Sequence, residues 1–542
     1  MKKFALILLL AGLAASCDKP NNSTDNPLPV EGSSDITYQI LVYSFADSNG
    51  DQIGDFRGII SKLDYLKDMG VGAIWLSPIH KSSSYHGYDV IDYESINPLF
   101  GTEADFVALL EAAHSKEIKI YLDYVINHSA KEHEWFKEAR KSPDSPYRDY
   151  YIFSDNPQSD ISNGRIAMIA QEGASGYDPG QWFSTGTGTT KYHSHFWTDW
   201  FADLNYGPVA TCEKSPAFIA VANAADKWIK MGVDGFRLDA VKHIYHSETS
   251  FENPEFLRKF YNRCNETYKV FNKGENIYMV GEVLSAADRV APYYRGLPTL
   301  FEFSFWWTLR DAINSGSGYW FGKNISDYRS QYNQVRRDAN AAIKLSNHDE
   351  NRTGSELGRS TAKEKLAACV LLTSEGDPYI YQGEELGYFG VKNNGDEYVR
   401  TPILWNENSR SAAIAGVNHK YDRNLLVKEY SVEHQANDIN SVLSTYQKFG
   451  KLRTEYPALN SGTMIEHKTY NPNNSKDRAV AAWYMSYKTQ NILVLHNFSG
   501  TEISLSLAED KLDNLIGSNG AVQQTGSSGV KLGAYSTALY LQ

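Results

Sequence analysis

The sequence predicts an α/β protein built around a (β/α)₈ TIM barrel, with a module inserted after the third barrel strand and a C-terminal β-sandwich. Two observations carry this prediction. The chain has 542 residues, which accommodates a barrel of roughly 250 to 400 residues together with appended modules. From Ile36 onward, short apolar runs alternate with segments of helical period, and this alternation is typical of parallel βα units.

The barrel prediction depends on eight apolar runs of strand length. Segments between them carry apolar residues three or four positions apart, which indicates helices with one buried face; residues 105–115 are an example. Eight strands are the number that closes such a barrel. The predicted strands are residues 38–43, 72–77, 118–124, 235–239, 278–282, 300–305, 342–347 and 378–381.

Two stretches interrupt the alternation, and each predicts a separate module. Residues 129–203 are dense in Ser, Gly, Tyr and Pro, show little helical period, and are too many for a plain loop. After a last predicted helix at 441–456, alternating runs such as 480–484 and 492–495 indicate β-strands. The predicted domains are the barrel at 36–128 and 204–457, the inserted module at 129–203, and the β-sandwich at 458–542.

The N-terminus has the composition of an export signal. A basic start precedes an apolar run at 4–15, which is too short to span a membrane permanently, and small residues that end at Cys17. We expect a lipoprotein signal peptide over residues 1–17, with acylation of Cys17. Residues 18–35 are rich in Asn, Ser, Pro and Asp and predict a flexible tether. An ordinary secretory peptide with an incidental cysteine is the alternative.

Composition and charge indicate which classes of binding partner the protein has. Lys and Arg total 53 against 65 Asp and Glu, so the net charge of −12 argues against nucleic acid or an anionic membrane surface as a partner. Aromatic residues make up 13% of the chain, which suits stacking against sugar faces, although a large packed core also explains this content. The other cysteines predict no disulfide framework and are expected to be small buried apolar residues: Cys212, Cys264 and Cys369.

Polar residues gather at the carboxyl ends of four predicted strands, where barrel enzymes carry their reacting groups. Four short motifs stand there, at residues 123–128, 235–243, 281–283 and 346–349. In this order and spacing they resemble the motifs of the α-amylase family of glycoside hydrolases, family 13, and the resemblance extends from about Ile36 to the C-terminus. One such motif is a weak signal, whereas four on the expected strands are hard to obtain by chance.

The resemblance is strongest to the surface-anchored starch-utilisation α-amylases of Bacteroidetes, through segments such as 195–206 and 241–249. It implies an endo-acting, retaining α-amylase that hydrolyses α-1,4-glucosidic bonds of starch, amylopectin and maltooligosaccharides. It also implies a lipid anchor in the outer membrane, display at the cell surface, and glycan-binding and transport proteins as neighbours.

Cleavage of a glycosidic bond requires one carboxylate at the anomeric carbon and one carboxylic acid that protonates the leaving oxygen. Asp239 and Arg237 are two positions apart on one strand and point the same way, so the guanidinium is expected to keep Asp239 ionised as the nucleophile. Glu282 ends the neighbouring strand, and the negative Asp239 should raise its pKa, as a general acid requires. A separation of roughly 5 to 5.5 Å between the two carboxyl groups would give retention.

The resemblance assigns further residues to the sugar in the −1 subsite. Asp349 is the third catalytic carboxylate and is expected to grip sugar hydroxyls and distort the ring. His128 and His348 are expected to contact hydroxyl groups around the transition state, with a structural role as the alternative for either histidine alone. Tyr88 is expected to stack under the sugar, with Asp89 supporting it.

Other residues are expected further along the cleft. By resemblance, Lys242 and His243 contact the sugars at +1 and +2, which favours an α-amylase over an exo-acting α-glucosidase. Arg400 is expected to reach the non-reducing side, with a solvated surface arginine as the alternative. Residues 203–205 resemble a motif of oligo-1,6-glucosidases and neopullulanases, although Ala202 replaces a common proline, so cleavage of pullulan stays open.

Oxygen-bearing side chains alternate directly after the first strand, and this density of hard ligands predicts Ca²⁺. The loop is not an EF-hand, because Gln52 stands at the position of the turn glycine and no Glu stands at the twelfth position; a bare acidic turn is the alternative. The ligands expected by resemblance are Asp47, Asn49, Asp51, the carbonyl of Ile53, and Asp55. The candidates for a second calcium site, which would brace the inserted module against the barrel, are Asn127, Asp203 and the carbonyl of His243.

Two alternative functions remain. A neopullulanase or an exo-α-glucosidase of the same family would differ in its products, because an endo-acting enzyme removes the iodine colour of starch before glucose accumulates. A glucan-binding lipoprotein that has lost catalysis belongs to another class, and the three intact carboxylates argue against it.

Overall fold

The computed structural model of the chain describes residues 36–272, 274–410, 423–425, 427–474 and 477–542. The predicted signal peptide at 1–17, with Cys17, and the predicted tether at 18–35 lie outside the described residues. Within the described part of the chain, no helix is both long enough and apolar enough to cross a membrane.

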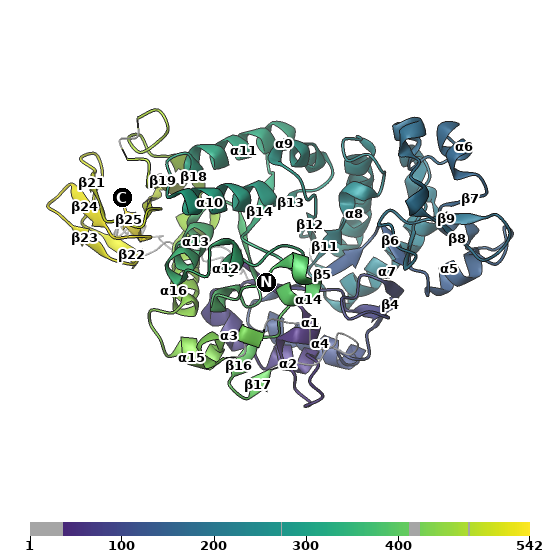
Figure 1. The fold of residues 1–542 in the computed structure, drawn as a ribbon, viewed down its shortest axis with the longest axis horizontal. Coiled ribbons are helices and arrows are strands. Elements are labelled where there is room, and N and C mark those ends of the chain that lie inside the picture. The colour runs from purple at the N-terminus through teal and green to yellow at the C-terminus, as the bar shows by residue number, and fades with distance from the viewer. Residues whose placement is uncertain (1–35, 273, 411–422, 426, 475–476) are drawn as a thin grey trace, which may run out of the picture.

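A closed barrel of parallel strands forms the centre of the molecule and confirms the predicted fold class (Figure 1). Each barrel strand pairs with the next barrel strand along the chain, and the last closes onto the first. The barrel strands are β1 (Thr37–Ile40), β2 (Ala73–Leu76), β5 (Lys119–Val125), β11 (Gly235–Asp239), β12 (Tyr278–Gly281), β13 (Thr299–Glu302), β14 (Asn340–Lys344) and β15 (Asp377–Tyr381).

All eight predicted strands are present, but three of them end three residues earlier than predicted. The seventh, 342–347, stops at Lys344. The first predicted strand, 38–43, stops at Ile40, and helix α1 (Val42–Phe45) follows. The sixth, 300–305, stops at Glu302, where helix α10 (Phe303–Ser315) begins. In both cases the apolar run continues from a buried strand into a buried helix, and such a run does not itself distinguish the two conformations.

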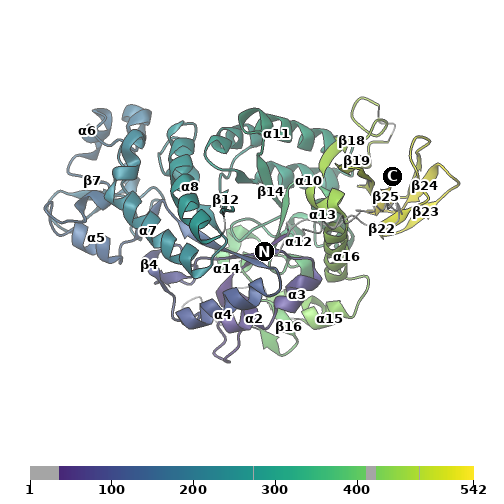
Figure 2. The same ribbon diagram turned by 180° about the vertical axis from the view of Figure 1, so that it is seen from behind.

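Helices connect the barrel strands and surround the barrel (Figures 1 and 2). Helix α4 starts with a capping box in which Thr102 and Asp105 satisfy each other's backbone N–H groups. The predicted helix at 441–456 is α16, capped by Ser441. These helices are α2 (Phe56–Ile60), α3 (Leu63–Asp68), α4 (Glu103–His114), α7 (Pro216–Met231), α8 (Glu252–Phe271), α9 (Ala287–Val290), α10, α11 (Phe321–Val335), α12 (Thr353–Glu356), α13 (Thr361–Thr373), α14 (Asp396–Val399), α15 (Val432–Ala436), α16 (Val442–Glu455) and α17 (Pro457–Ser461).

Side chains fill the barrel interior, so the barrel is a packed core rather than a channel. Trp75 packs against Phe301 with ring centroids 5.5 Å apart, and Tyr121 stacks on Tyr278 at 4.4 Å. As predicted, the three described cysteines are free and buried. Polar groups can therefore reach solvent only at the ends of the strands, which is where the candidate site lies.

The inserted module lies at one end of the long axis of the molecule (Figure 1). Strand β10 pairs with β6, which directly follows β5, and a second small sheet has the order β7-β9-β8. The module contains β6 (His128–Ala130), α5 (Glu134–Ala139), β7 (Phe153–Ser154), α6 (Pro157–Ser162), β8 (Trp182–Ser184), β9 (Lys191–His193) and β10 (Phe201–Asp203). A hairpin of β3 (His80–Ser82) and β4 (Val90–Ile96) follows β2.

The C-terminal domain lies at the opposite end and consists of two antiparallel sheets, as a β-sandwich does (Figures 1 and 2). The larger sheet has the order β18-β19-β20-β25-β22, and the smaller has the order β21-β24-β23. Their strands are β18 (Thr463–Glu466), β19 (Val480–Tyr487), β20 (Gln490–Asn497), β21 (Ile503–Ser506), β22 (Leu515–Asn519), β23 (Val522–Gln524), β24 (Gly529–Leu532) and β25 (Thr537–Leu541).

Candidate active site

The three predicted catalytic carboxylates meet in one pocket at the carboxyl ends of the barrel strands. Asp239 is the last residue of β11, Glu282 directly follows β12, and Asp349 lies in the loop after β14. Because Leu238 and Gly281 are paired in register, the backbone N–H of Glu282 donates to the carbonyl of Leu238 at 3.1 Å and places Glu282 beside Asp239. All three carboxylates line a pocket of about 580 Å³.

A single buried arginine links the carboxylates beneath this pocket. Nη1 of Arg237 lies 2.6 Å from Oδ1 of Asp239 and 2.8 Å from Oδ1 of Asp123. Its Nη2 lies 2.8 Å from Oε2 of Glu282, close enough for an ion pair although not aligned as a hydrogen bond. One guanidinium therefore compensates three carboxylates, and Asp123 is a member of the site that the sequence analysis missed.

Burial dominates the protonation of these carboxyl groups. It raises the pKa of both Asp239 and Glu282, while Arg237 opposes the rise in each. The prediction of a raised pKa for Glu282 therefore holds, but Arg237 does not prevent a rise for Asp239. Burial also raises the pKa of Asp123 to about 7. Beneath the pocket, the guanidinium of Arg237 thus faces three buried carboxyl groups whose pKa values are all raised.

Asp349 faces the pocket and is the carboxylate with the most cationic surroundings. Its Oδ1 lies 2.9 Å from Nη2 of Arg400 and 3.0 Å from Nζ of Lys392. Burial acts to raise the pKa of Asp349, but His348, Arg400 and Lys392 outweigh it and bring that pKa well below its usual value. Arg400 is only 4% exposed, so it is not the solvated surface residue of the alternative interpretation.

Tyr88 and His348 form a stacked pair between Asp123 and Asp349. Their ring planes are 2° apart, with centroids at 5.5 Å. The side-chain amide of Gln39 donates to Nδ1 of His348 at 2.8 Å, which leaves the proton of the neutral ring on Nε2. That Nε2 lies 2.6 Å from the hydroxyl of Tyr88 and 3.0 Å from Oδ2 of Asp349, and Tyr88 donates in turn to Asp123 at 2.9 Å. The network fixes the ring of Tyr88 at the pocket wall.

Not every predicted substrate-binding residue reaches the pocket surface. Tyr88, His128, Lys242, His243 and Arg400 line it. The others lie behind it and act on those that do: Arg237, Asp89 and His348.

Asp89 holds the hairpin that carries Tyr88. Its carboxylate accepts hydrogen bonds from the hydroxyls of Ser82 and Ser83, each at 2.5 Å, and from that of Ser84. Burial acts to raise the pKa of Asp89, but these hydrogen bonds lower it overall. Asp89 therefore ties the start of the turn that contains Tyr88 to its end.

Lys242 and His243 lie on the side of the pocket that is formed by the inserted module. Nζ of Lys242 donates to the carbonyl of Leu284 at 2.9 Å. The ring of His243 lies 5.6 Å from that of Phe196, and Phe196 and Trp200 of the module also line the pocket. Trp200 is 59% exposed, so a flat aromatic surface extends from the pocket toward solvent.

The predicted first calcium loop folds back on its own oxygen atoms. Oδ1 of Asn49 and Oδ1 of Asp51 each accept the backbone N–H two residues ahead at 2.8 Å. The carboxylate of Asp47 accepts the backbone N–H groups of residues 49, 50 and 52. Gln52 has φ = 73°, the left-handed conformation that the turn glycine of a calcium loop adopts. The donors have the hard-oxygen chemistry that suits Ca²⁺, although the carboxylate oxygens of these described aspartates, Asp55 included, do not all lie within 4.8 Å of one another.

The candidates for the second calcium site lie where the inserted module joins the barrel. Asn127 follows β5, and its carbonyl accepts the N–H of Leu204 at 3.1 Å, directly after Asp203. Oδ2 of Asp203, however, is 2.7 Å from Nδ1 of His193 and 3.0 Å from the backbone nitrogen of His195. The side chain beside this carboxylate is thus an imidazole, and Ca²⁺ prefers oxygen ligands to nitrogen ligands.

Comparison with known proteins covers almost the whole chain. The family described as "Alpha amylase, catalytic domain" matches residues 39–462, and the one described as "Alpha-amylase SusG C-terminal domain" matches residues 480–539. "Alpha-amylase SusG" of Bacteroides thetaiotaomicron is 42% identical, with 99% of this chain and 98% of the relative covered. That alignment spans 681 positions, more than the 542 residues of this chain, so the relative contains segments that this chain lacks.

Two further similar proteins are an oligo-1,6-glucosidase and an α-amylase. "Oligo-1,6-glucosidase" of Parageobacillus thermoglucosidasius is 30% identical over 86% of this chain and 90% of the relative. Among solved structures, an α-amylase from H. orenii superposes with a TM-score of 0.78 at 30% identity, covering 95% of this chain and 100% of that chain.

Proposed function

The chain belongs to the α-amylase family of glycoside hydrolases, and we propose on that premise that it is an endo-acting, retaining α-amylase that hydrolyses α-1,4-glucosidic bonds of starch, amylopectin and maltooligosaccharides. One observation carries the proposal: Arg237 joins Asp239 and Glu282 at the floor of a single pocket. A guanidinium that spans both carboxylates supports the short separation that retention requires.

In the first step, a carboxylate oxygen of Asp239 forms a bond to the anomeric carbon while Glu282 transfers its proton to the glycosidic oxygen, and the bond to the leaving sugar breaks. Glu282, now ionised, then accepts a proton from water, whose oxygen attacks the same carbon and releases Asp239. Two inversions give net retention. Arg237 compensates the negative charge that moves between the two carboxylates during this cycle.

The surrounding residues position the sugar. Tyr88 would stack on the ring in the −1 subsite, and Asp349, held by Arg400, would accept hydrogen bonds from its hydroxyl groups. His128 lines the same pocket, and burial lowers its pKa to about 4, so it is neutral and able to donate to an oxygen atom at pH 7.

The plus side of the pocket supports binding of a substrate with several sugars. Lys242, His243 and the exposed Trp200 would contact sugars beyond the cleaved bond. By resemblance, the pair Lys242 and His243 favours an α-amylase over an exo-acting α-glucosidase. The alternatives are a neopullulanase or an exo-α-glucosidase, favoured by the match to an oligo-1,6-glucosidase. A glucan-binding lipoprotein without catalysis is the distant alternative.

Sizing the products from amylose and pullulan tests this proposal. We expect maltooligosaccharides from amylose and loss of iodine colour before glucose accumulates. Release of glucose alone from the first minutes would indicate an exo-α-glucosidase, and rapid conversion of pullulan would indicate a neopullulanase. Full starch breakdown by the Asp239→Asn variant would contradict the assigned mechanism, and binding without breakdown by the unaltered chain would indicate a glucan-binding protein.

We also propose Ca²⁺ at the loop of Asp47, Asn49, Asp51, Ile53 and Asp55, supported by its oxygen donors and by the left-handed Gln52. The ion would brace the segment after β1. A second calcium ion at Asn127, Asp203 and the carbonyl of His243 stays a prediction.

The proposed location is the outer membrane, with the lipid anchor at Cys17 and the catalytic chain at the cell surface. The lipoprotein-like start of the sequence supports the anchor, and starch is too large to enter a cell intact. Glycan-binding and transport proteins would then be neighbours that take up the products. The net charge of −12 continues to argue against nucleic acid as a partner.

A further inference from the structure

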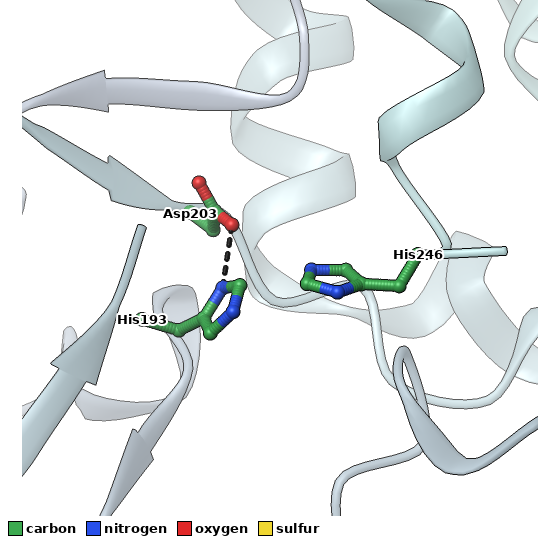
Figure 3. Close-up of side chains that lie close together, drawn as sticks. All are labelled: His193, Asp203 and His246. Carbon is green, nitrogen blue, oxygen red and sulfur yellow. Dashed lines mark hydrogen bonds and ion pairs between the residues drawn. The ribbon is translucent and has the colours of Figure 1, made fainter. Parts of the chain in front are cut away.

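Three buried side chains from separate segments converge where the inserted module meets the barrel (Figure 3). His193 ends β9 and Asp203 ends β10, both in the inserted module, whereas His246 lies shortly after the 3₁₀ turn η5 (Val241–His243) that follows β11. One ligand atom from each lies within 4.8 Å of the other two, and they form the one such group of three among the described residues. Their exposed fractions are 0%, 3% and 8%.

Two atoms of this group are buried without a partner. Within the described part of the chain, neither Oδ1 of Asp203 nor Nε2 of His193 has a hydrogen-bond partner. An unpaired polar atom in a buried position is destabilising. A cation bound by the Asp203 carboxylate would give Oδ1 of Asp203 a partner.

The hydrogen bond between the two residues shows which nitrogen of His193 faces the carboxylate. Nδ1 of His193 lies 2.7 Å from Oδ2 of Asp203, so the ring donates there and carries its proton on Nδ1. A metal ion would displace this proton, so that Nδ1 of His193 and the carboxylate of Asp203 would both become ligands.

We propose that His193, Asp203 and His246 bind a transition metal ion of the Zn²⁺ class. Two imidazoles and a carboxylate oxygen are a typical ligand set for zinc with one coordination position left, whereas Ca²⁺ takes six to eight oxygen atoms. The fourth position has a neighbour in the chain: Nδ1 of His195 lies 3.4 Å from Nε2 of His246. His195 or a water molecule would complete a tetrahedron.

The site would join the two parts that form the active-site pocket. His193 and Asp203 belong to the module that supplies Phe196 and Trp200, and His246 belongs to the segment that carries Lys242 and His243. The backbone N–H of His246 also donates to the carbonyl of Met168, another residue of the module, at 3.0 Å. A bound ion would therefore fix the width of the pocket on its plus side without touching the reacting atoms.

Metal analysis of the full chain tests this inference independently of the glycosidase activity. The protein is stripped with a chelator, dialysed against Zn²⁺, Co²⁺ or Ca²⁺, and measured for bound metal and for melting temperature. We expect one equivalent of Zn²⁺ per chain, a rise in Tm with Zn²⁺, and visible absorption of the Co²⁺ form that is typical of a tetrahedral site. The Co²⁺ spectrum requires no variant, so it remains informative if a substitution impairs folding.

Two variants locate the ion. His246→Ala should weaken Zn²⁺ binding by at least about tenfold and abolish the Co²⁺ absorption, whereas His434→Ala, at an exposed histidine of α15, should change neither. Binding of Zn²⁺ that His246→Ala leaves intact would overturn the assignment. Retention of a second Ca²⁺ ion that Zn²⁺ does not displace would also overturn it, in favour of the oxygen site at Asn127, Asp203 and His243.

Discussion

Nη1 of Arg237 lies 2.6 Å from Oδ1 of Asp239, two residues further along β11. Alternate residues of a strand point to the same side, so the pairing follows directly from the spacing in the sequence. The same guanidinium reaches Glu282 on the next strand and is fully buried. Loss of its planar shape should therefore affect both reacting groups together.

Arg237→Lys tests this dependence. An ammonium keeps the charge but cannot contact two carboxylates with two separate nitrogens, so we expect kcat/KM to fall by roughly 100-fold or more. Arg237 lowers the pKa of both Asp239 and Glu282. One ammonium cannot contact both carboxyl groups, so the acidic limb of the pH profile should move to higher pH. A fall in activity with an unmoved acidic limb would contradict the shared electrostatic role.

Glu282→Gln and Asp239→Asn should fail in different ways. Without its acid, the Glu282→Gln enzyme should lose about 10²- to 10⁴-fold activity on starch, but much less on an α-glucoside whose leaving group needs no proton, such as a nitrophenolate. Asp239→Asn lacks the nucleophile and should lose activity on both substrates. Steady-state kinetics with both substrates provide the measurement, and equal losses for Glu282→Gln on the two would exclude it as the acid.

Buried Glu364 of α13 should make stability depend on pH. Burial raises its pKa from 4.5 to about 7, so the folded chain holds this proton more tightly than the unfolded chain, and stability is lost as pH rises from about 4.5 to 7. Glu364→Gln stays neutral, so its advantage over the original chain should grow across that window to about 3 kcal/mol.

Denaturant unfolding at pH 4.5 and pH 8 measures this difference. Glu433→Gln, at an exposed position of α15, is the matched control and should change stability at neither pH. An effect of Glu364→Gln that is the same at both pH values would indicate a change in packing instead of a titration.

Removal of Ca²⁺ should destabilise the chain if the loop after β1 holds the ion. At a free concentration 100 times Kd, the bound ion would contribute about 2.7 kcal/mol. EDTA should therefore lower Tm, and added Ca²⁺, in place of Zn²⁺, should restore this part of the loss. Asp51→Ala should abolish the response to Ca²⁺, while Asp288→Ala, whose side chain is 72% exposed, should keep it. A melt of Asp51→Ala that still responds fully to Ca²⁺ would place the ion elsewhere.

Cys17→Ala should release the enzyme from membranes if this thiol carries the lipid. Fractionation of expressing cells into membrane and soluble proteins, followed by immunoblotting, measures the distribution. Cys212→Ala alters a buried free cysteine of the catalytic chain and should leave membrane association unchanged. Equal membrane association of the Cys17→Ala protein would exclude the anchor.

Much of the site could be predicted from the sequence because its signals are local. Arg237 and Asp239 share a face through the period of a strand, and the four motifs lie at strand ends, where a barrel exposes polar groups. The eight strands were predictable from apolar runs, but the end of the sixth was not, because the residues after Glu302 stay apolar while the backbone becomes helical.

The tertiary structure determined which side chains contact the site residues and how burial shifts the pKa of the catalytic carboxyl groups. Asp123 contacts Arg237 across 114 positions, and Gln39 contacts His348 across 309, distances along the chain at which no spacing rule applies. The raised pKa of Asp239 depends on how completely the surrounding strands exclude water, and the group of His193, Asp203 and His246 exists only because an inserted module folds back onto a barrel loop. The spacing of residues along a strand can be read from the sequence. The burial of a side chain and its contacts with distant residues depend on how the folded chain packs.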